Sequence, residues 1–368
     1  MTLAASPTLD EIVSLLKRIC EVPAPTFEEG ARGELLVQLL KETGLSPQTD
    51  EVGNVTARLS GGTGPRVLIA AHLDTVFDAD VDVSVRQKDG RLCAPGIGDN
   101  SASLAVLVRF TQQVMQGEHT QRPRLTVAAT VGEEGLGDLY GMRHLMETRA
   151  QDFDFAIALD GHLGALINAS VGSKRFEVRF LASGGHSWGD FPSPSATHAL
   201  GHAVYELSKL SLPEQPRSSY NVGQVWGGTS INAIAQEAGF NLDLRSRDER
   251  VLEKLEQDAL RRITKVAKRH NVELETKLVG DRPTANVPNE PLVRAARDAL
   301  SAVSVRTRLA ASSTDANAAM AAGLSAVAFG VYRGGDAHRL SEWLEPQSLV
   351  TGYRALVHFM ENLGALEV

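Results

Sequence analysis

Cysteine and long hydrophobic runs are scarce in this sequence of 368 residues. Its two cysteines, Cys20 and Cys93, are too few for the disulfide framework of a small secreted domain, which favours a reducing compartment. The chain has no stretch of about 20 apolar residues, so no transmembrane helix is expected. Near the start of the chain, Asp10 and Glu11 interrupt any apolar segment, so no secretory signal is expected. These absences predict a cytoplasmic protein.

Positive charge is also in short supply. Lys and Arg number 37 against 45 Asp and Glu, which gives a net charge of -8. A chain with this balance is a poor partner for nucleic acid or for an anionic membrane, and neither is expected to bind. The length, with 43% hydrophobic and 22% charged residues, indicates a globular protein of two domains.

Two polar residues follow a predicted buried strand. Residues 66–71 are a nearly continuous apolar run, as in a strand buried on both faces of a parallel sheet, and the run ends in His72-Leu73-Asp74. Residues two apart on a strand point to the same side, so His72 and Asp74 can share one site in which Asp74 orients the imidazole. A polar strand end with a helix-capping Asp is the alternative interpretation.

A pair of adjacent carboxylates follows a second predicted strand, residues 125–131. Glu133 and Glu134 repel each other unless a cation or a proton separates their roles. One of them can therefore bind a metal while the other moves a proton. A solvated acidic turn is the alternative.

Three further candidate ligands lie in loops. Asp160 follows a third apolar run, and His162 competes with it two residues further on. Asp99 precedes a predicted helix, where it could cap the helix or bridge two metals. His338 follows the predicted strand 326–330, where a solvated loop histidine is the alternative.

The separate signals agree with one another. In open α/β sheets, ligands bind at the carboxyl ends of the strands, where these imidazole and carboxylate groups stand. Zn²⁺ accepts both kinds of donor, and two such ions about 3.5–4 Å apart can activate one water and polarise one carbonyl. The joint pattern predicts a hydrolase with two metal ions.

Taken in their order along the chain, and over nearly its whole length, these motifs resemble those of a co-catalytic zinc metallopeptidase family. The family contains peptidase T, glutamate-releasing carboxypeptidase, acetylornithine deacetylase, succinyl-diaminopimelate desuccinylase and aminoacylase. The resemblance implies two divalent metal ions, zinc with cobalt or manganese as alternatives, on the ligands His72, Asp99, Glu134, Asp160 and His338. It implies Asp99 as the bridge, one metal on His72 and Asp160, and the other on Glu134 and His338. Glu133 is then the general base. Asp74 is the carboxylate that orients His72, and Glu342 matches the Glu that follows the family's final ligand histidine, here His338.

Three polar positions in the middle of the chain resemble those of the family's lid domain. His186, in the run 184–187, is similar to the lid histidine that reaches the active site of the dimer partner and steadies the oxyanion. Asn232 and Arg245 are similar to lid residues that hold the substrate carboxylate, which suits the fork of an arginine. The resemblance therefore implies a homodimer formed through the lid.

The predicted elements support a fold of the α/β class. Strands alternate with helices up to about residue 165 and again after about residue 282, which predicts a mostly parallel sheet with helices on both faces. Between these parts, the predicted order β-α-β-β-α-β is that of a ferredoxin-like fold. We therefore predict a catalytic domain of residues 1–167 and 281–368, with an inserted α+β lid or dimerisation domain at 168–280. Thr8 and Glu11 predict a capping box on the first helix.

Two substrate classes fit the same chemistry. In the family, Asp as the fourth acidic ligand goes with peptidase T and the dipeptidases, and residues 227–235 are also similar to peptidase T. The resemblance thus favours an aminopeptidase for di- or tripeptides over a deacylase for N-acetyl or N-succinyl amino acids. Ser101 stands where the family often has Lys, which leaves nearby substrate contacts open. A non-catalytic scaffold would be expected to have lost ligands or the base, and this chain has them all.

Other short patterns have simpler interpretations. His198 and His202 share a helix face, but the Glu of a His-Glu-x-x-His motif is absent, so we expect surface or interface histidines. Residues 61–64 are glycine-rich, precede a strand and lack the Lys of a phosphate loop, so we expect a flexible turn. Residues 312–315 predict an N-cap or support for the site, not a nucleophilic serine.

Overall fold

The computed structural model describes residues 7–117 and 123–365. The chain divides into two compact units, one made of Met1–Ser170 with Asn286–Val368 and the other of Val171–Ala285. Strand β8 (Ala165–Ser170) belongs to the sheet of the first unit, and β14 (Glu273–Arg282) belongs to the sheet of the second. The chain therefore crosses between the units a few residues beyond 167 and 280.

The first unit is built on an eight-stranded sheet with the order β1-β2-β6-β3-β7-β16-β8-β15. Besides β8, its strands are β1 (Gln48–Thr49), β2 (Val55–Arg58), β3 (Arg66–His72), β6 (Arg124–Thr130), β7 (Phe155–Ala158), β15 (Arg308–Ser312) and β16 (Ser325–Phe329). The neighbours β6, β3, β7 and β16 all run parallel. The pairs β1–β2, β2–β6 and β16–β8 are antiparallel. The predicted mostly parallel α/β sheet is confirmed.

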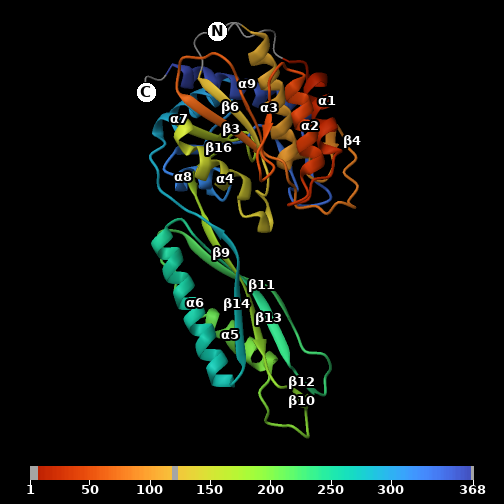
Figure 1. Cartoon of the computed structure of the whole chain (residues 1–368), viewed down its shortest axis with the longest axis vertical. Coiled ribbons are helices and arrows are strands. Elements are labelled where there is room, and N and C mark those ends of the chain that lie inside the picture. The colour runs from red at the N-terminus through yellow and green to blue at the C-terminus, as the bar shows by residue number, and fades with distance from the viewer. Residues whose placement is uncertain (1–6, 118–122, 366–368) are drawn as a thin grey trace. The chain divides into compact units, whose positions relative to one another are not determined.

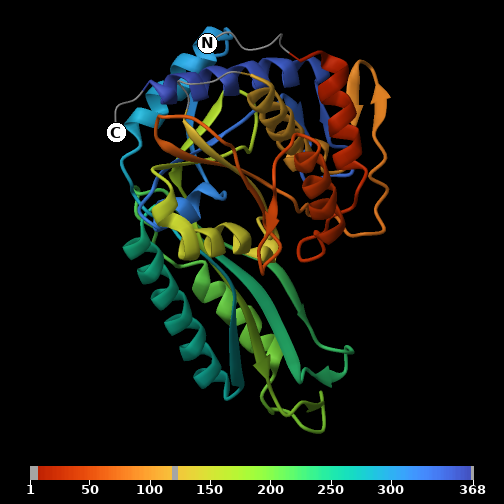
Figure 2. The same cartoon turned by 45° about the horizontal axis from the view of Figure 1, so that its top comes forward.

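Helices pack around this sheet, as Figures 1 and 2 show. They are α1 (Leu9–Cys20), α2 (Gly30–Lys41), α3 (Ser103–Gln116), α4 (Tyr140–Arg149), α7 (Glu290–Ala302), α8 (Ala316–Ala321) and α9 (Pro346–Gly364). The capping box of α1 is present, since Glu11 N donates to Thr8 Oγ1 and Thr8 N donates to Glu11 Oε2. Strand β3 is buried from its second residue to His72, which explains why its sequence is a continuous apolar run.

A second, small sheet of the first unit escaped sequence reasoning. It has the order β17-β18-β5-β4, with β4 (Arg86–Lys88), β5 (Arg91–Cys93), β17 (Gly334–Gly335) and β18 (Trp343–Leu344). Strands of two or three residues show no measurable period, so the pattern of apolar residues cannot reveal them. This sheet nevertheless matters for the site, because β18 follows directly after the loop that carries His338.

The second unit has the predicted ferredoxin-like order. Its elements are β9 (Gly172–Leu181), α5 (Ala196–Leu207), β11 (Ser218–Gly227), β13 (Glu237–Ser246), α6 (Glu249–His270) and β14, and they form the sheet β11-β13-β9-β14. Its core includes Phe180 and Phe240, whose ring centroids lie 6.3 Å apart, packed with apolar side chains of α5 and α6. A two-stranded extension, β10 (Gly185–His186) with β12 (Ala233–Ile234), completes the unit.

In the described ranges, none of the helices combines the length and the apolar character needed to cross a bilayer.

Candidate functional site

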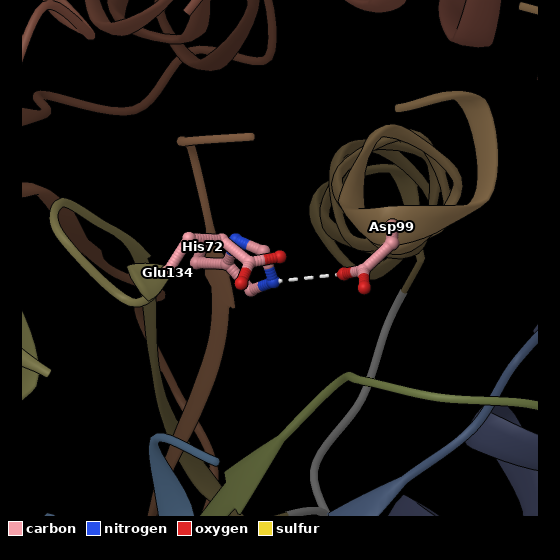
Figure 3. A group of neighbouring side chains, drawn as sticks. All are labelled: His72, Asp99 and Glu134. Carbon is pink, nitrogen blue, oxygen red and sulfur yellow. Dashed lines mark hydrogen bonds and ion pairs between the residues drawn. The ribbon is translucent and has the colours of Figure 1, made fainter. Parts of the chain in front are cut away.

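The site begins at the carboxyl end of β3. His72 is the last residue of the strand and is 2% exposed. Its Nδ1 lies 3.0 Å from the backbone oxygen of Asp74 and 3.4 Å from Asp74 Oδ1, whereas its Nε2 lies 3.1 Å from Asp99 Oδ1. Burial alone would lower the pKa of His72, but its contacts with the Asp74 and Asp99 carboxylates raise that pKa well above the usual value. Figure 3 shows Nε2 facing the Asp99 carboxylate.

Asp99 places its two carboxylate oxygens on two different histidines. Oδ1 faces His72, and Oδ2 lies 3.1 Å from His338 Nε2. The same nitrogen of His338 lies 3.0 Å from Glu134 Oε1. The two acidic neighbours raise the pKa of His338 to about 11. Residues from three distant parts of the chain, 99, 134 and 338, thus converge on one point.

The loop that carries Asp99 is held by one buried carboxylate. Glu342 is 1% exposed, and it accepts hydrogen bonds from Gly96 N at 2.8 Å, Gly98 N at 2.9 Å and Asp99 N at 2.9 Å. Burial and the charge of Asp99 raise the pKa of Glu342 to about 7, although the three amides oppose that shift. The Glu that follows His338 therefore positions the loop that presents Asp99.

Asp74 performs a similar task for the two glutamates. Its carboxylate is fully buried and accepts from Glu133 N at 3.0 Å, from Glu134 N at 2.8 Å and from Thr26 Oγ1 at 2.9 Å. One side chain therefore contacts His72 and also holds the backbone of both residues of the acidic pair. Sequence reasoning anticipated the first contact, whereas the second was missed.

Asp160 follows β7 and is surrounded by negative charge. Burial and the nearby carboxylates of Asp99 and Glu134 raise the pKa of Asp160 to about 7, against the opposing effect of His72. Crowded carboxylates of this kind are stabilised by cations, since a bound cation favours the charged form of each. The ligand atoms of His72, Asp99 and Glu134 all lie within 4.8 Å of one another. Imidazole nitrogens with carboxylate oxygens are the donors that zinc accepts, so the residues fit a metal centre.

The competing patterns have other partners in the structure. The ring of His162 stacks edge-on against Tyr332, with centroids 5.1 Å apart, and burial lowers the pKa of His162. His202 does not pair with His198; its Nδ1 lies 2.9 Å from His270 Nε2 on α6. Asp315 accepts from Thr130 Oγ1 at 2.6 Å at the end of β6, which supports the strand that leads to Glu133.

The predicted lid residues fall into two groups within the second unit. His186 and Asn232 are close, because β10 pairs with β12 and Ser187 N donates to the Asn232 backbone oxygen at 2.9 Å. Arg245 lies near the opposite end of β13, opposite Ser173, whereas Glu237 at the other end pairs with Leu181. At about 3.3 Å per residue, roughly 26 Å of strand separates Arg245 from the end that carries β10 and β12. Figure 1 shows β10 and β12 at one end of this sheet.

Backbone amides also define the proton position on His186. Trp188 N and Gly189 N donate to His186 Nδ1 at 3.2 and 3.3 Å. A ring nitrogen that accepts hydrogen bonds leaves the proton of neutral imidazole on the other nitrogen, so Nε2 carries the hydrogen. The exposed imidazole therefore offers a hydrogen-bond donor.

A mostly parallel sheet with clustered imidazole and carboxylate groups at its strand ends is an architecture typical of metal-dependent hydrolases of the α/β class. The chain belongs to peptidase family M20/M25/M40, whose model matches residues 68–362. It is 27% identical to the succinyl-diaminopimelate desuccinylase of Corynebacterium glutamicum over 269 residues, which are 68% of this chain and 72% of that protein.

Solved structures show the same fold. A tripeptidase from Staphylococcus aureus aligns over 98% of this chain and 100% of its own, with a TM-score of 0.82 and 18% identity. The aminopeptidase PepT from Bacillus cereus aligns over 97% of this chain and 99% of its own, with a TM-score of 0.79 and 19% identity. At these identities the likeness establishes a fold of the peptidase T type for this chain, and the substrate needs a separate argument.

Proposed function

We propose that this protein is a two-metal aminopeptidase that removes the amino-terminal residue of short peptides, of tripeptidase or dipeptidase type. The observation that carries the proposal is the Asp99 carboxylate, with one oxygen 3.1 Å from His72 Nε2 and the other 3.1 Å from His338 Nε2. A carboxylate between two imidazoles, each with a further acidic residue nearby, matches the arrangement needed to hold two adjacent cations.

In this proposal, His72 and Asp160 would hold one cation and Glu134 and His338 would hold the other, with Asp99 as a ligand that the two sets would share. The contact of His338 with Glu134 at 3.0 Å supports this grouping. Zinc is the first choice, with cobalt or manganese as alternatives. When bound, such cations lower the pKa of water and polarise the scissile carbonyl.

Glu133 is the proposed general base. It is 5% exposed, and its backbone is held by Asp74. Its carboxylate takes a proton from the attacking water and returns it to the leaving amine, the usual cycle of a base at a hydrolytic centre. Asp74 keeps His72 and the acidic pair in register during this cycle.

His186, Asn232 and Arg245 are proposed to contact the substrate. The Nε2 hydrogen of His186 suits an oxyanion, and the guanidinium of Arg245 suits a carboxylate. Since roughly 26 Å of strand lies between their two ends of the sheet, one lid cannot bring both groups to one small substrate. We therefore propose that His186 acts on the active site of a second copy of the chain.

The surface of the second unit supports a homodimer. Strand β11 forms one edge of its sheet, and edge strands readily pair with another chain. Near this edge and its extension, large apolar side chains are exposed: Val225 61%, Phe191 74%, Trp188 89% and Ile231 103%. Light scattering of the purified protein tests this, and a fully active monomer would remove the role of His186 in a partner.

A deacylase for N-acyl amino acids is the second candidate, and the similarity to a desuccinylase favours it. Its chemistry would use the same ligands and the same base. Asp160 and the peptidase T-like structures of the neighbours support the peptidase instead.

The few cysteines and the negative charge support a cytoplasmic location without nucleic acid or membrane partners.

One experiment separates the candidates. Protein reconstituted with zinc is incubated with di- and tripeptides that have free amino termini, together with N-acetyl and N-succinyl amino acids, and products are identified by mass spectrometry. Loss of the first residue from the peptides would establish the peptidase. Release of acetate or succinate with intact peptides would establish the deacylase. Glu133→Gln is the matched control, since it should stop turnover while zinc remains bound.

A further inference from the structure

The segment between α1 and α2 reaches into the metal site. Thr26 Oγ1 donates to Asp74 Oδ2 at 2.9 Å, and Gly132 N donates to Glu29 Oε1 at 2.9 Å. The match to the family model begins at residue 68, so both side chains lie outside the matched range. They nevertheless contact residues adjacent to, or supporting, the proposed catalytic groups.

Glu29 is buried although it stands at the N-cap of a helix, α2. It is 5% exposed, and its side chain makes no capping hydrogen bond with that helix among the described residues. Burial raises the pKa of Glu29. Removing a carboxylate from water costs free energy unless hydrogen bonds compensate. The backbone amide of Gly132 donates one such hydrogen bond to Glu29.

A buried arginine anchors the same segment. Arg32 is 1% exposed, and its Nη1 donates to the backbone oxygen of Leu73 at 2.8 Å. Its Nε and Nη2 both donate to the Val22 oxygen, at 2.9 and 2.6 Å. The guanidinium thus ties the end of α1 to the residue that precedes Asp74. Glu29, three residues earlier, is held against the site by this anchor.

Together, the carboxylates of Glu29 and Asp74 accept hydrogen bonds from three consecutive backbone amides. Gly132 N donates to Glu29, while Glu133 N and Glu134 N donate to the two oxygens of Asp74. Gly132 has a φ of 63°, so the chain turns at the point where Glu29 holds it. The path of the loop that leads from β6 to the acidic pair is therefore set by two carboxylates from elsewhere in the sequence.

We propose that Glu29 is a positioning residue for Glu133, and that Thr26 supports the same loop through Asp74. This inference rests on the proposed function, in which Glu133 is the general base. A base must lie within about 2.6–3.2 Å of the atom that gives up its proton, and a displacement of about 1 Å can lower the rate 100-fold. Glu29 holds the residue immediately before Glu133, so it sets where that carboxylate begins.

The test compares three variants of neighbouring glutamates. Glu29→Ala removes the acceptor and should lower kcat about 10- to 100-fold with KM and zinc content nearly unchanged. Glu29→Gln keeps an oxygen acceptor for Gly132 N and should restore most of kcat. Glu28→Ala is the matched control, because Glu28 is exposed and next in sequence, and it should behave as the wild type.

Hydrogen exchange supplies a readout that does not need turnover. In Glu29→Ala the amides of residues 132–134 should exchange faster, while those of the central strand β3 keep their protection. If the wild type hydrolyses nothing on the substrate panel, the proposed function fails, and exchange still decides whether Glu29 holds the loop.

Thr26 gives a second, milder pair of variants if Glu29→Ala does not fold. Thr26→Val removes only the hydroxyl and should lower kcat, whereas Thr26→Ser keeps the hydroxyl and should restore it. The inference is overturned if folded Glu29→Ala, or folded Thr26→Val in its place, keeps wild-type kcat and wild-type protection of residues 132–134.

Discussion

The carboxylate of Asp74 offers the sharpest test of how this site is built. Asp74→Asn keeps the size of the side chain but replaces one acceptor oxygen with an amino group. In the structure, one oxygen accepts from Glu133 N at 3.0 Å and the other from Glu134 N at 2.8 Å. Asn can satisfy only one of these amides, so a donor faces a donor at the other.

The magnitude follows from burial. Asp74 is fully buried, so the amide that loses its acceptor cannot turn to water, and such a group costs about 1–3 kcal/mol of folding free energy. The contact with His72 Nδ1 changes as well, and loss of a carboxylate behind a metal-bound imidazole weakens metal affinity about 10- to 100-fold. Both effects are expected together in Asp74→Asn.

The assay measures zinc affinity by competition with a chelator, and it measures stability by urea unfolding of the metal-free protein. Asp154→Asn is the matched control, because Asp154 accepts from Arg66 N at 2.7 Å at the opposite end of β3. This control should lose stability and keep its zinc affinity. If Asp74→Asn loses stability but binds zinc as tightly as the wild type, then Asp74 only supports the fold, and its proposed role behind His72 is wrong.

Four further predictions follow from the same contacts. Glu133→Gln should lower kcat about 100- to 10,000-fold and keep two zinc ions, as measured by steady-state kinetics and elemental analysis; a near-normal rate would exclude Glu133 as the base. His338→Ala should lower the zinc content from two ions to one per chain, and full occupancy at equal zinc would contradict the ligand grouping. His186→Ala should lower kcat more than it raises KM, and mixed dimers with Glu133→Gln should recover activity if His186 acts in the partner. Hydrogen bonds from Arg66 hold the pKa of Asp154 below its usual value, so its stabilising effect is present above about pH 4 and lost as the pH falls through the lower folded value; the difference in Tm between wild type and Asp154→Asn should shrink from pH 5 to pH 2.

Much of the fold could be predicted from the sequence because its elements have strong local patterns. The apolar run before His72 predicted β3, and the alternating and amphipathic stretches of the middle segment predicted the ferredoxin-like order of the second unit. Local pattern failed where elements were too short, as in the small sheet of β4, β5, β17 and β18. It also could not show that His202 pairs with His270 on α6, because that contact depends on how two helices pack.

The candidate ligands were visible in the sequence for a similar reason. Four of the five stand at the end of a predicted strand or in the loop after it, and parallel strands end at the same edge of a sheet. Asp99 differs, since it stands before a predicted helix. Their supporting groups were less visible. Glu342 was noted only as the residue that follows His338, and its hold on the Gly96–Asp99 backbone joins positions more than 240 residues apart.

The sequence by itself therefore determined which imidazole and carboxylate groups are candidates to bind metal, through residue chemistry and the resemblance to a known family, and it determined where most strands and helices fall along the chain, through local periodicity. Only the tertiary structure decided how those residues are held. Three sets of contacts join distant segments of the chain. Asp74 accepts hydrogen bonds from both glutamates, Glu29 accepts one from Gly132, and Asp99 has one oxygen close to each histidine. The physical reason is that a buried carboxylate is stable only where folding brings donors to it, and no local pattern records which donors those will be.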